Sequence, residues 1–246
     1  MQGASIRQLL REIPFSPGQW LLDIGSNTCW ASNFFARHGL QVIALDISLW
    51  EMQGLYTADY FIEDGLSYFE RVLGSMNDMP IASESLDYVF ACEVLHHNDS
   101  DGLRRTFEEA YRVLRPGGRM LVVNETLKTV HDPVGVHTEA VEQFEGYEHA
   151  HWASQYRWAA IRAGFSTRLL EPSYHGYFSQ PTNGPKPALT DVRARASYEL
   201  RSTPLGRKAL LSYINHVAGG TAFGMIATKR SRESLRGFRR RSAPNG

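Results

Sequence analysis

The sequence predicts a doubly wound α/β fold, in which a mostly parallel β-sheet is covered by helices on both faces. Two observations predict it. Short apolar runs that end in turn residues alternate with helical patterns along most of the 246 residues. Strands that alternate with helices form parallel sheets, because each helix carries the chain back to the start of the next strand. A chain of this length suits one domain better than two.

The expected elements follow one another in this alternating order. The first 15 residues predict a short amphipathic helix, with Ile6, Leu9, Leu10 and Ile13 on one face and Pro14 at its end. Apolar runs bounded by turn residues predict strands at residues 20–24, 41–45, 72–75, 86–91, 119–123, 165–170 and 221–228. Helical patterns predict helices at residues 28–38, 58–72, 103–114 and 151–163.

Two segments, residues 124–150 and 173–220, break the alternation. Each is longer than an ordinary loop, and long insertions after a strand's carboxyl end often form lids or substrate walls. We expect the domain to cover residues 1–230 with these two insertions. Residues 231–246 are polar and rich in arginine, which predicts a disordered basic tail.

Composition limits the partners. The formal net charge is +0, so the whole chain has no electrostatic attraction to nucleic acid or to an anionic membrane. No apolar run approaches the ~18 residues that a membrane span needs, and the first residues show no signal-peptide pattern. The 2 cysteines do not make a disulfide framework, which fits a reducing cytoplasm. A homodimer is left open.

The loop after the first expected strand has the pattern of a ligand-binding loop. Gly25 follows the strand directly, and a glycine there lets the backbone come close to a ligand. Asp46 ends the next strand, roughly ~20 residues on, the separation at which an acid meets ribose hydroxyls in dinucleotide folds. An ordinary strand–loop–helix with a solvated aspartate gives the same pattern, so this loop alone leaves both interpretations open.

The loops that follow carry a family resemblance. After the third strand stands G-S-M-N-D-M-P-I at residues 74–81; L-D-Y-V-F-A-C-E-V-L-H-H spans residues 86–97, and V-L-R-P-G-G spans residues 113–118. This ordered set resembles the class I S-adenosylmethionine-dependent methyltransferase family over about residues 20–125, and more weakly at residues 163–165 and 223–229. The resemblance implies a Rossmann-like, seven-stranded sheet with an antiparallel last strand, S-adenosylmethionine as the cofactor, and methyl transfer.

The resemblance also implies how the methionine and ribose parts of the cofactor would be held. Asp23 and Gly25 would bracket the methionine part, with Ser26 and Asn27 in the same loop. Asp46 would accept hydrogen bonds from the ribose hydroxyls.

The adenine and the methionine amino group would be held by three further stretches of chain. Ile47 would pack on the adenine, and Ser75, Met76 and Asn77 would lie along its edge. The backbone of Cys92 would accept from the methionine amino group.

This chain departs from the family pattern at three positions. Asn27 and Cys29 stand where the family has glycines. Asparagine tolerates left-handed backbone angles better than most residues, so Asn27 can keep the turn, and Cys29 is small enough to pack against the sheet. Ser75 stands where relatives usually carry an aspartate, and a hydroxyl is a weaker acceptor for the adenine amino group.

Two histidines are the candidate catalytic residues. His96 and His97 follow the fourth strand, beside the expected position of the methyl group. Imidazole titrates near neutral pH and can remove a proton from an acceptor. We favour His97 as the base. The alternative is that one of these histidines shapes the loop and packs on the cofactor.

The first insertion and its surroundings allow a metal site, which we do not predict. The spacing of His149 and His151 does not put both rings on one helix face, so a substrate wall or solvated loop fits better. The candidate ligands are His131, His137, His149 and His151, with Asp132, Glu145 and Glu148. The aromatic residues that either line an acceptor pocket or belong to the core are Trp152, Tyr156, Trp158, Tyr174, Tyr177 and Phe178.

The sequence favours a small-molecule acceptor, methylated on oxygen, nitrogen or carbon in a biosynthetic pathway. C-E-V-L follows the fourth strand, where enzymes that methylate amino groups of nucleobases or glutamine carry N-P-P-Y or D-P-P-Y. Two other hypotheses remain: an RNA or protein methyltransferase that docks its partner through the basic tail, and a non-methylating S-adenosylmethionine-binding protein.

Overall fold

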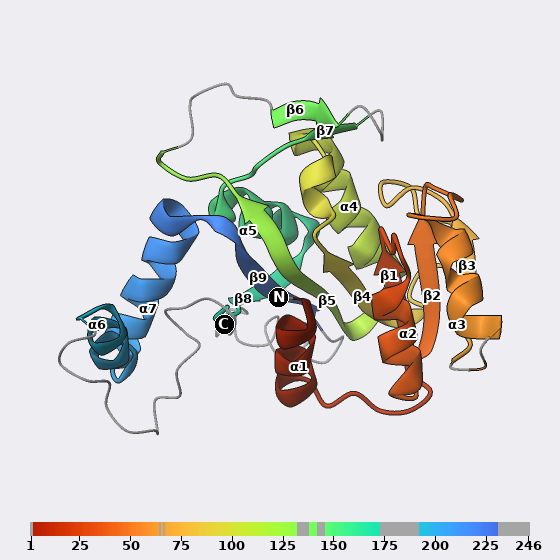
Figure 1. The fold of residues 1–246 in the computed structure, drawn as a ribbon, viewed down its shortest axis with the longest axis horizontal. Helices are drawn as coiled ribbons and strands as arrows, with labels where there is room; N and C mark the ends of the chain where they lie inside the picture. Colours follow the sequence, from red (N-terminus) through yellow and green to blue (C-terminus); the bar gives the residue numbers. More distant parts are fainter. Residues whose placement is uncertain are drawn as a thin grey trace, which may run out of the picture.

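The structure is a computed structural model that describes residues 2–63, 65, 67–131, 138–141, 146–172 and 192–230, and all structural statements concern those residues. Seven strands form one sheet, and two shorter ones form a separate hairpin (Figure 1). The sheet strands are β1 (Trp20–Ile24), β2 (Gln41–Asp46), β3 (Glu70–Leu73), β4 (Leu86–Cys92), β5 (Leu114–Leu127), β8 (Phe165–Leu169) and β9 (Gly220–Lys229), and the hairpin strands are β6 (Thr138–Val141) and β7 (Gly146–Glu148).

Helices connect these strands. None of those in the described ranges is both long and apolar enough to cross a membrane. The α-helices are α1 (Gln2–Glu12), α2 (Trp30–Arg37), α3 (Asp59–Glu63), α4 (Ser100–Val113), α5 (Ala153–Ala163), α6 (Val192–Arg201) and α7 (Pro204–Tyr213), with short helical turns η1 (Leu55–Ala58), η2 (Leu95–His97) and η3 (Ile214–Ala218).

The strand order is β3-β2-β1-β4-β5-β9-β8. β1 to β5 are parallel, and β9 is antiparallel to both of its neighbours. The predicted doubly wound, seven-stranded sheet with an antiparallel last strand is confirmed. Because the chain runs from β1 outward to β3 and then returns to β4, the strand order reverses between β1 and β4. The loops that follow these two strands therefore flank the place where such sheets bind ligands.

The sheet is buried because its strands are apolar on both faces. In β4, Val89 belongs to the core cluster on the α4–α5 side, which also contains Phe107, and Phe90 packs on the α1–α2 side against Phe35. All four side chains are fully buried. A strand that is buried on both faces reads as a continuous apolar run rather than an alternating one, and residues 86–92 fit that pattern.

The helix expected at residues 58–72 forms only as far as Glu63, and the rest of that prediction is wrong. α3 ends at Glu63, and Gly65 has a φ of 64°, a left-handed conformation that a continuing helix does not contain. Glu70–Leu73 then pairs in parallel with β2, from Ile43 to Asp46. The strand expected at residues 72–75 thus begins two residues earlier, because pairing with β2 outweighs the local helical pattern.

β5 is longer than the strand expected at residues 119–123. Its first residue, Leu114, pairs with Leu86, and the ladder resumes where Arg119 pairs with Tyr88, so the R-P-G-G stretch bulges out of register. At its other end β5 continues to Leu127 and pairs with β9. The expected insertion at residues 124–150 therefore begins as sheet. Residues 173–191 and the expected tail at 231–246 lie outside the described residues.

Lys229, the last residue of β9, fixes the junction between α4 and β5. Its ammonium donates to the carbonyls of Tyr111, at 2.8 Å, and Leu114, at 2.7 Å, and it lies 4.6 Å from the centre of the Tyr111 ring. The residue is only 7% exposed. A cation is favourable at this end of a helix, where carbonyls lack partners within the helix.

We expect Lys229→Met to lower the free energy of unfolding by about 1–3 kcal/mol, because two buried carbonyls lose their donor. Urea unfolding measures this loss. The control is Arg230→Met at the next, exposed position, which should leave stability nearly unchanged. Equal stability of the two variants would contradict the structural role of Lys229.

Candidate functional site

The loop after β1 contains three residues in left-handed conformation. φ is 61° at Gly25, 45° at Asn27 and 53° at Cys29. Asn27 keeps the turn as predicted. Cys29 is fully buried in the α1–α2 core, as its small size allows. Both residues that stand in place of glycine therefore adopt the left-handed backbone that a glycine adopts readily.

Gly25 is needed for a further reason, which is the close approach of another loop. A Cβ at this position would overlap Cγ2 of Val94, which stands in the turn after β4. The β1 loop and the turn after β4 are therefore packed on each other at the point where the strand order reverses. Any larger residue at position 25 would push them apart.

Asp46 joins the β1 and β2 loops. Its Oδ2 accepts from the backbone N–H of Asn27 at 2.9 Å, and its Oδ1 accepts from the N–H of Ser48 at 2.9 Å. Ile47, beside it, is 74% exposed. The structure thus brings together Gly25, Ser26, Asn27 and Asp46, as the sequence predicted, with an exposed apolar side chain at their edge.

Asp23 is a buried acid beneath the β1 loop. Its carboxylate accepts from the Ser32 hydroxyl at 2.6 Å, and the residue is 3% exposed. Burial raises the pKa of Asp23 to about 7, the Ser32 hydrogen bond opposes this, and the nearby charge of Asp46 adds to it. Asp23 therefore changes its charge near neutral pH.

The loop after β3 is tied to the turn after β4 through Asn98, which sequence analysis did not single out. Asn77 donates from its side-chain amide to Asn98 Oδ1 at 2.9 Å and accepts from the Thr106 hydroxyl at 2.6 Å. Asn98 donates to Met76 Sδ at 3.5 Å. The Ser75 hydroxyl accepts from the N–H of Asn77 at 3.1 Å. The residues expected along the adenine edge therefore form part of one network.

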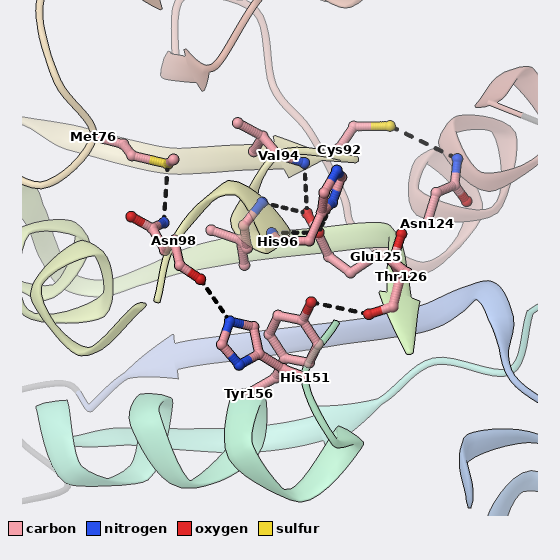
Figure 2. Close-up of polar contacts among 11 residues, drawn as sticks. Met76, Cys92, Val94, His96, Asn98, Asn124, Glu125, Thr126, His151 and Tyr156 are labelled. Carbon is pink, nitrogen blue, oxygen red and sulfur yellow. Dashed lines mark hydrogen bonds and ion pairs between the residues drawn. The ribbon is translucent and has the colours of Figure 1, made fainter. Parts of the chain in front are cut away.

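The turn after β4 is held by a buried carboxylate from β5, that of Glu125 (Figure 2). Glu125 Oε1 accepts from the backbone N–H groups of Val94 and Leu95, and Oε2 accepts from the backbone N–H of His96 and lies 3.1 Å from its Nδ1. His96 is 8% exposed, whereas the adjacent His97 is exposed. No local sequence pattern identifies Glu125, because its partners lie about 30 residues earlier in the chain.

His151 does not lie on a helix, contrary to the helix expected at residues 151–163. α5 begins at Ala153, and His151 precedes it, with 3% exposure. Its Nε2 donates to the Asn98 carbonyl at 2.8 Å, and burial lowers the pKa of His151, which favours the neutral ring. Tyr156, on α5, donates its hydroxyl to the Thr126 carbonyl of β5 at 3.0 Å, so in Figure 2 His151 supports the turn and Tyr156 supports β5, both from below.

Cys92 faces the N-terminal helix. Asn124 donates to Cys92 Sγ at 3.7 Å and accepts from the Ser5 hydroxyl of α1 at 2.6 Å. Burial raises the pKa of the Cys92 thiol far above its usual range, so the sulfur stays protonated and is no nucleophile. α1 thereby reaches the carboxyl end of β5.

The histidines of the first insertion form no described metal centre. Within the described ranges, no group of three or more histidine, cysteine, aspartate or glutamate side chains could hold a metal ion. His137, Asp132 and Glu145 lie outside the described residues. The backbone N–H of His149 donates to the carbonyl of His96 at 2.6 Å, so the end of this segment packs on the turn after β4.

The aromatic residues that were expected near the acceptor do not share one environment. Tyr156 is a core residue with no exposure, Trp158 is 60% exposed, and Trp152 is half-buried. The other three, Tyr174, Tyr177 and Phe178, lie outside the described residues.

Known methyltransferases are similar to this chain in sequence and in fold. The model of the family described as methyltransferase domain matches residues 22–122. The biotin biosynthesis bifunctional protein BioHC of Cellvibrio japonicus is 32% identical over 123 residues, which are 50% of this chain and 23% of that protein. Malonyl-(acyl-carrier protein) O-methyltransferase of Pectobacterium atrosepticum is 30% identical over 121 residues, 48% of this chain and 43% of that protein. The chain thus spans less than half the length of either relative.

Solved structures share the fold. Geranyl diphosphate C-methyltransferase from Streptomyces coelicolor, solved with Mg²⁺, geranyl-S-thiolodiphosphate and S-adenosyl-L-homocysteine, aligns with a TM-score of 0.59. The alignment covers 92% of this chain and 76% of that chain at 17% sequence identity. At this identity the likeness establishes the architecture.

We expect the free energy of unfolding to fall as pH rises from about 4 to 7, because Asp23 titrates differently in the folded and unfolded chain. In this interval the unfolded chain has released the Asp23 proton, because the ordinary pKa is 3.8, whereas the folded protein still holds it. The loss reaches a magnitude on the order of 4 kcal/mol at ~1.36 kcal/mol per pH unit. Asp23→Asn removes this titration, so its advantage over the unmodified protein should grow across the interval.

Urea unfolding of both proteins at several pH values measures this difference. Asp101→Asn, at an exposed position of α4, is the matched control and should keep a constant offset. An offset for Asp23→Asn that stays constant between pH 4 and 7 would contradict the raised pKa.

Proposed function

Because this chain belongs to the class I S-adenosylmethionine-dependent methyltransferase family, we propose that it transfers a methyl group from S-adenosylmethionine to an oxygen, nitrogen or carbon atom of a small-molecule acceptor. The observation that carries the proposal is the meeting of the loops after β1, β2 and β4 where the strand order reverses.

The residues present fit the cofactor. A carboxylate offers about four acceptor sites, and Asp46 uses one on each oxygen for a backbone N–H, which leaves capacity for two ribose hydroxyls. Ile47 presents an exposed apolar side chain beside it, suited to the face of a purine. Asp23 places a titrating acid beneath the loop proposed to hold the methionine part, which carries positive charge.

The work of the protein in this reaction is alignment. The cofactor supplies a methyl group that is already activated on a sulfonium. The loops after β1 and β4 orient the reactants and exclude water, and alignment alone supplies a large share of the barrier reduction in two-substrate reactions. A proton acceptor is needed only where the acceptor atom loses a proton as it is methylated.

A small acceptor is supported by three observations. The relatives described above include proteins named for biotin biosynthesis and for malonyl O-methylation. The formal net charge of +0 gives no general attraction to nucleic acid. The segment that returns from the β6–β7 hairpin packs on the turn after β4 through His149 and His96, as a substrate wall would.

Both cysteines are free thiols, which is consistent with a cytoplasmic protein.

We expect Asp46→Ala to weaken binding of S-adenosylhomocysteine by more than about 1 kcal/mol, because charge-assisted hydrogen bonds to the ribose are lost. Titration calorimetry measures the affinity. Asp46→Asn tests the charge separately, since its side chain keeps one oxygen. Glu51→Gln, an exposed acid in the next loop, is the matched control. Unchanged affinity in Asp46→Ala would contradict the placement of the ribose.

The acceptor class is tested by label transfer. The protein is incubated with S-adenosylmethionine carrying a tritiated methyl group and with a cell extract separated into small-molecule, RNA and protein fractions. We expect label in the small-molecule fraction. In the RNA and protein fractions we expect no label above the background measured with Asp46→Ala. Label in RNA or protein would refute the small-molecule proposal. Removal of residues 231–246 would then show whether the basic tail docks that partner.

A further inference from the structure

The Glu125 side chain is the most heavily engaged polar group in the site. It is completely buried at the end of β5, where the strand extends past its expected end. Oε1 lies 3.0 Å from the nitrogen of Val94 and 3.1 Å from that of Leu95. Oε2 lies 3.3 Å from the nitrogen of His96 and 3.1 Å from its Nδ1 (Figure 2). One carboxylate therefore meets four donors from three successive residues.

The backbone contacts fix the shape of the turn. A buried carboxylate is costly unless hydrogen bonds satisfy its oxygens, and here three consecutive backbone N–H groups do so. These groups would otherwise lack partners at the start of the η2 turn. Val94 in turn lies against Gly25, so the carboxylate also determines how closely the turn approaches the β1 loop.

The fourth contact fixes the proton on the imidazole. An ionised carboxylate only accepts hydrogen bonds, and the backbone N–H of His96 already points at Oε2. Nδ1 therefore has to carry the hydrogen in the contact with Oε2. In the neutral ring the other nitrogen, Nε2, then carries the lone pair. The same arrangement, a carboxylate on one ring nitrogen that sets the role of the other, orients histidine bases in other enzymes.

We propose that Glu125 is a positioning residue that holds the turn at residues 94–96 and keeps His96 in the Nδ1–H form, so that His96 Nε2 is the atom that takes a proton from the acceptor. The proton role rests on the proposed function; the tautomer does not. Sequence analysis favoured the adjacent His97, which the structure places at an exposed position. A histidine whose ring orientation is fixed is better suited to directional proton removal than one on the surface.

Nuclear magnetic resonance of the imidazole nitrogens tests the tautomer in the full chain without ligand. The protein is labelled with nitrogen-15 histidine and measured in mildly alkaline buffer, where an ordinary imidazole is neutral. The pattern that disappears in His96→Gln belongs to His96, and His97→Gln is the matched control that removes a different pattern. We expect a protonated Nδ1 and a lone pair on Nε2. An Nε2–H form, a rapid mixture of both forms or a doubly protonated ring would overturn the proposal.

Glu125→Met tests the cause. Methionine is of similar length but carries no oxygen, so nothing at this position accepts a hydrogen bond from Nδ1 of His96. We expect the His96 pattern to change from a fixed Nδ1–H form toward Nε2–H. An unchanged Nδ1–H pattern would show that Glu125 does not set the tautomer. If the variant does not fold, the spectrum of the unmodified protein still decides the tautomer.

The label-transfer assay tests the proton role. With an acceptor that loses a proton, we expect His96→Gln to lower the rate about 100-fold or more, the size of effect that general bases supply. An unchanged rate for such an acceptor would refute the role of Nε2. Failure of the unmodified protein to bind S-adenosylhomocysteine would refute the proposed function instead and would leave the tautomer result standing.

Discussion

The packing of the turn after β4 onto the β1 loop is the constraint on which the rest of the site depends. Gly25 permits the contact because it has no Cβ, and Val94 occupies the space that a Cβ would need. The backbone of Val94 is held from the other side by Glu125. A single side chain on β5 thus determines how two loops meet at the reversal point of the sheet, where the fold binds its ligands.

The same turn connects the side of the site proposed for the cofactor to the side proposed for the acceptor. Asn98, at its end, accepts from Asn77 in the β3 loop through its side chain and from His151 through its carbonyl. The segment before α5 therefore contacts the residues expected along the adenine edge through one residue. All of these partners are buried or partly buried, and buried hydrogen-bonded networks favour a single arrangement because partial satisfaction is costly.

Sequence reasoning predicted what local patterns encode and missed what distant pairing creates. Gly25, Asn27 and Asp46 could be placed from their positions after short apolar runs, and the structure brings them together. Glu125 could not be found in this way, because the signal is a buried carboxylate whose donors stand 29 to 31 residues earlier. The second half of the helix expected at residues 58–72 does not form, for a related reason. Residues 70–73 pair with β2, and this pairing outweighs their local helical pattern.

The two acids at the carboxyl ends of β1 and β2 favour a cationic ligand. Asp23 is buried, and the charge of Asp46 nearby contributes to the rise of its pKa. A positive group bound beside these acids would oppose both effects, since it stabilises the ionised carboxylate. Proton release from Asp23 and binding of a cation are then linked, so each favours the other. An anionic ligand at the same tips would meet the opposite balance, and this is why a nucleoside bearing a sulfonium suits the site better than a nucleotide with a phosphate there.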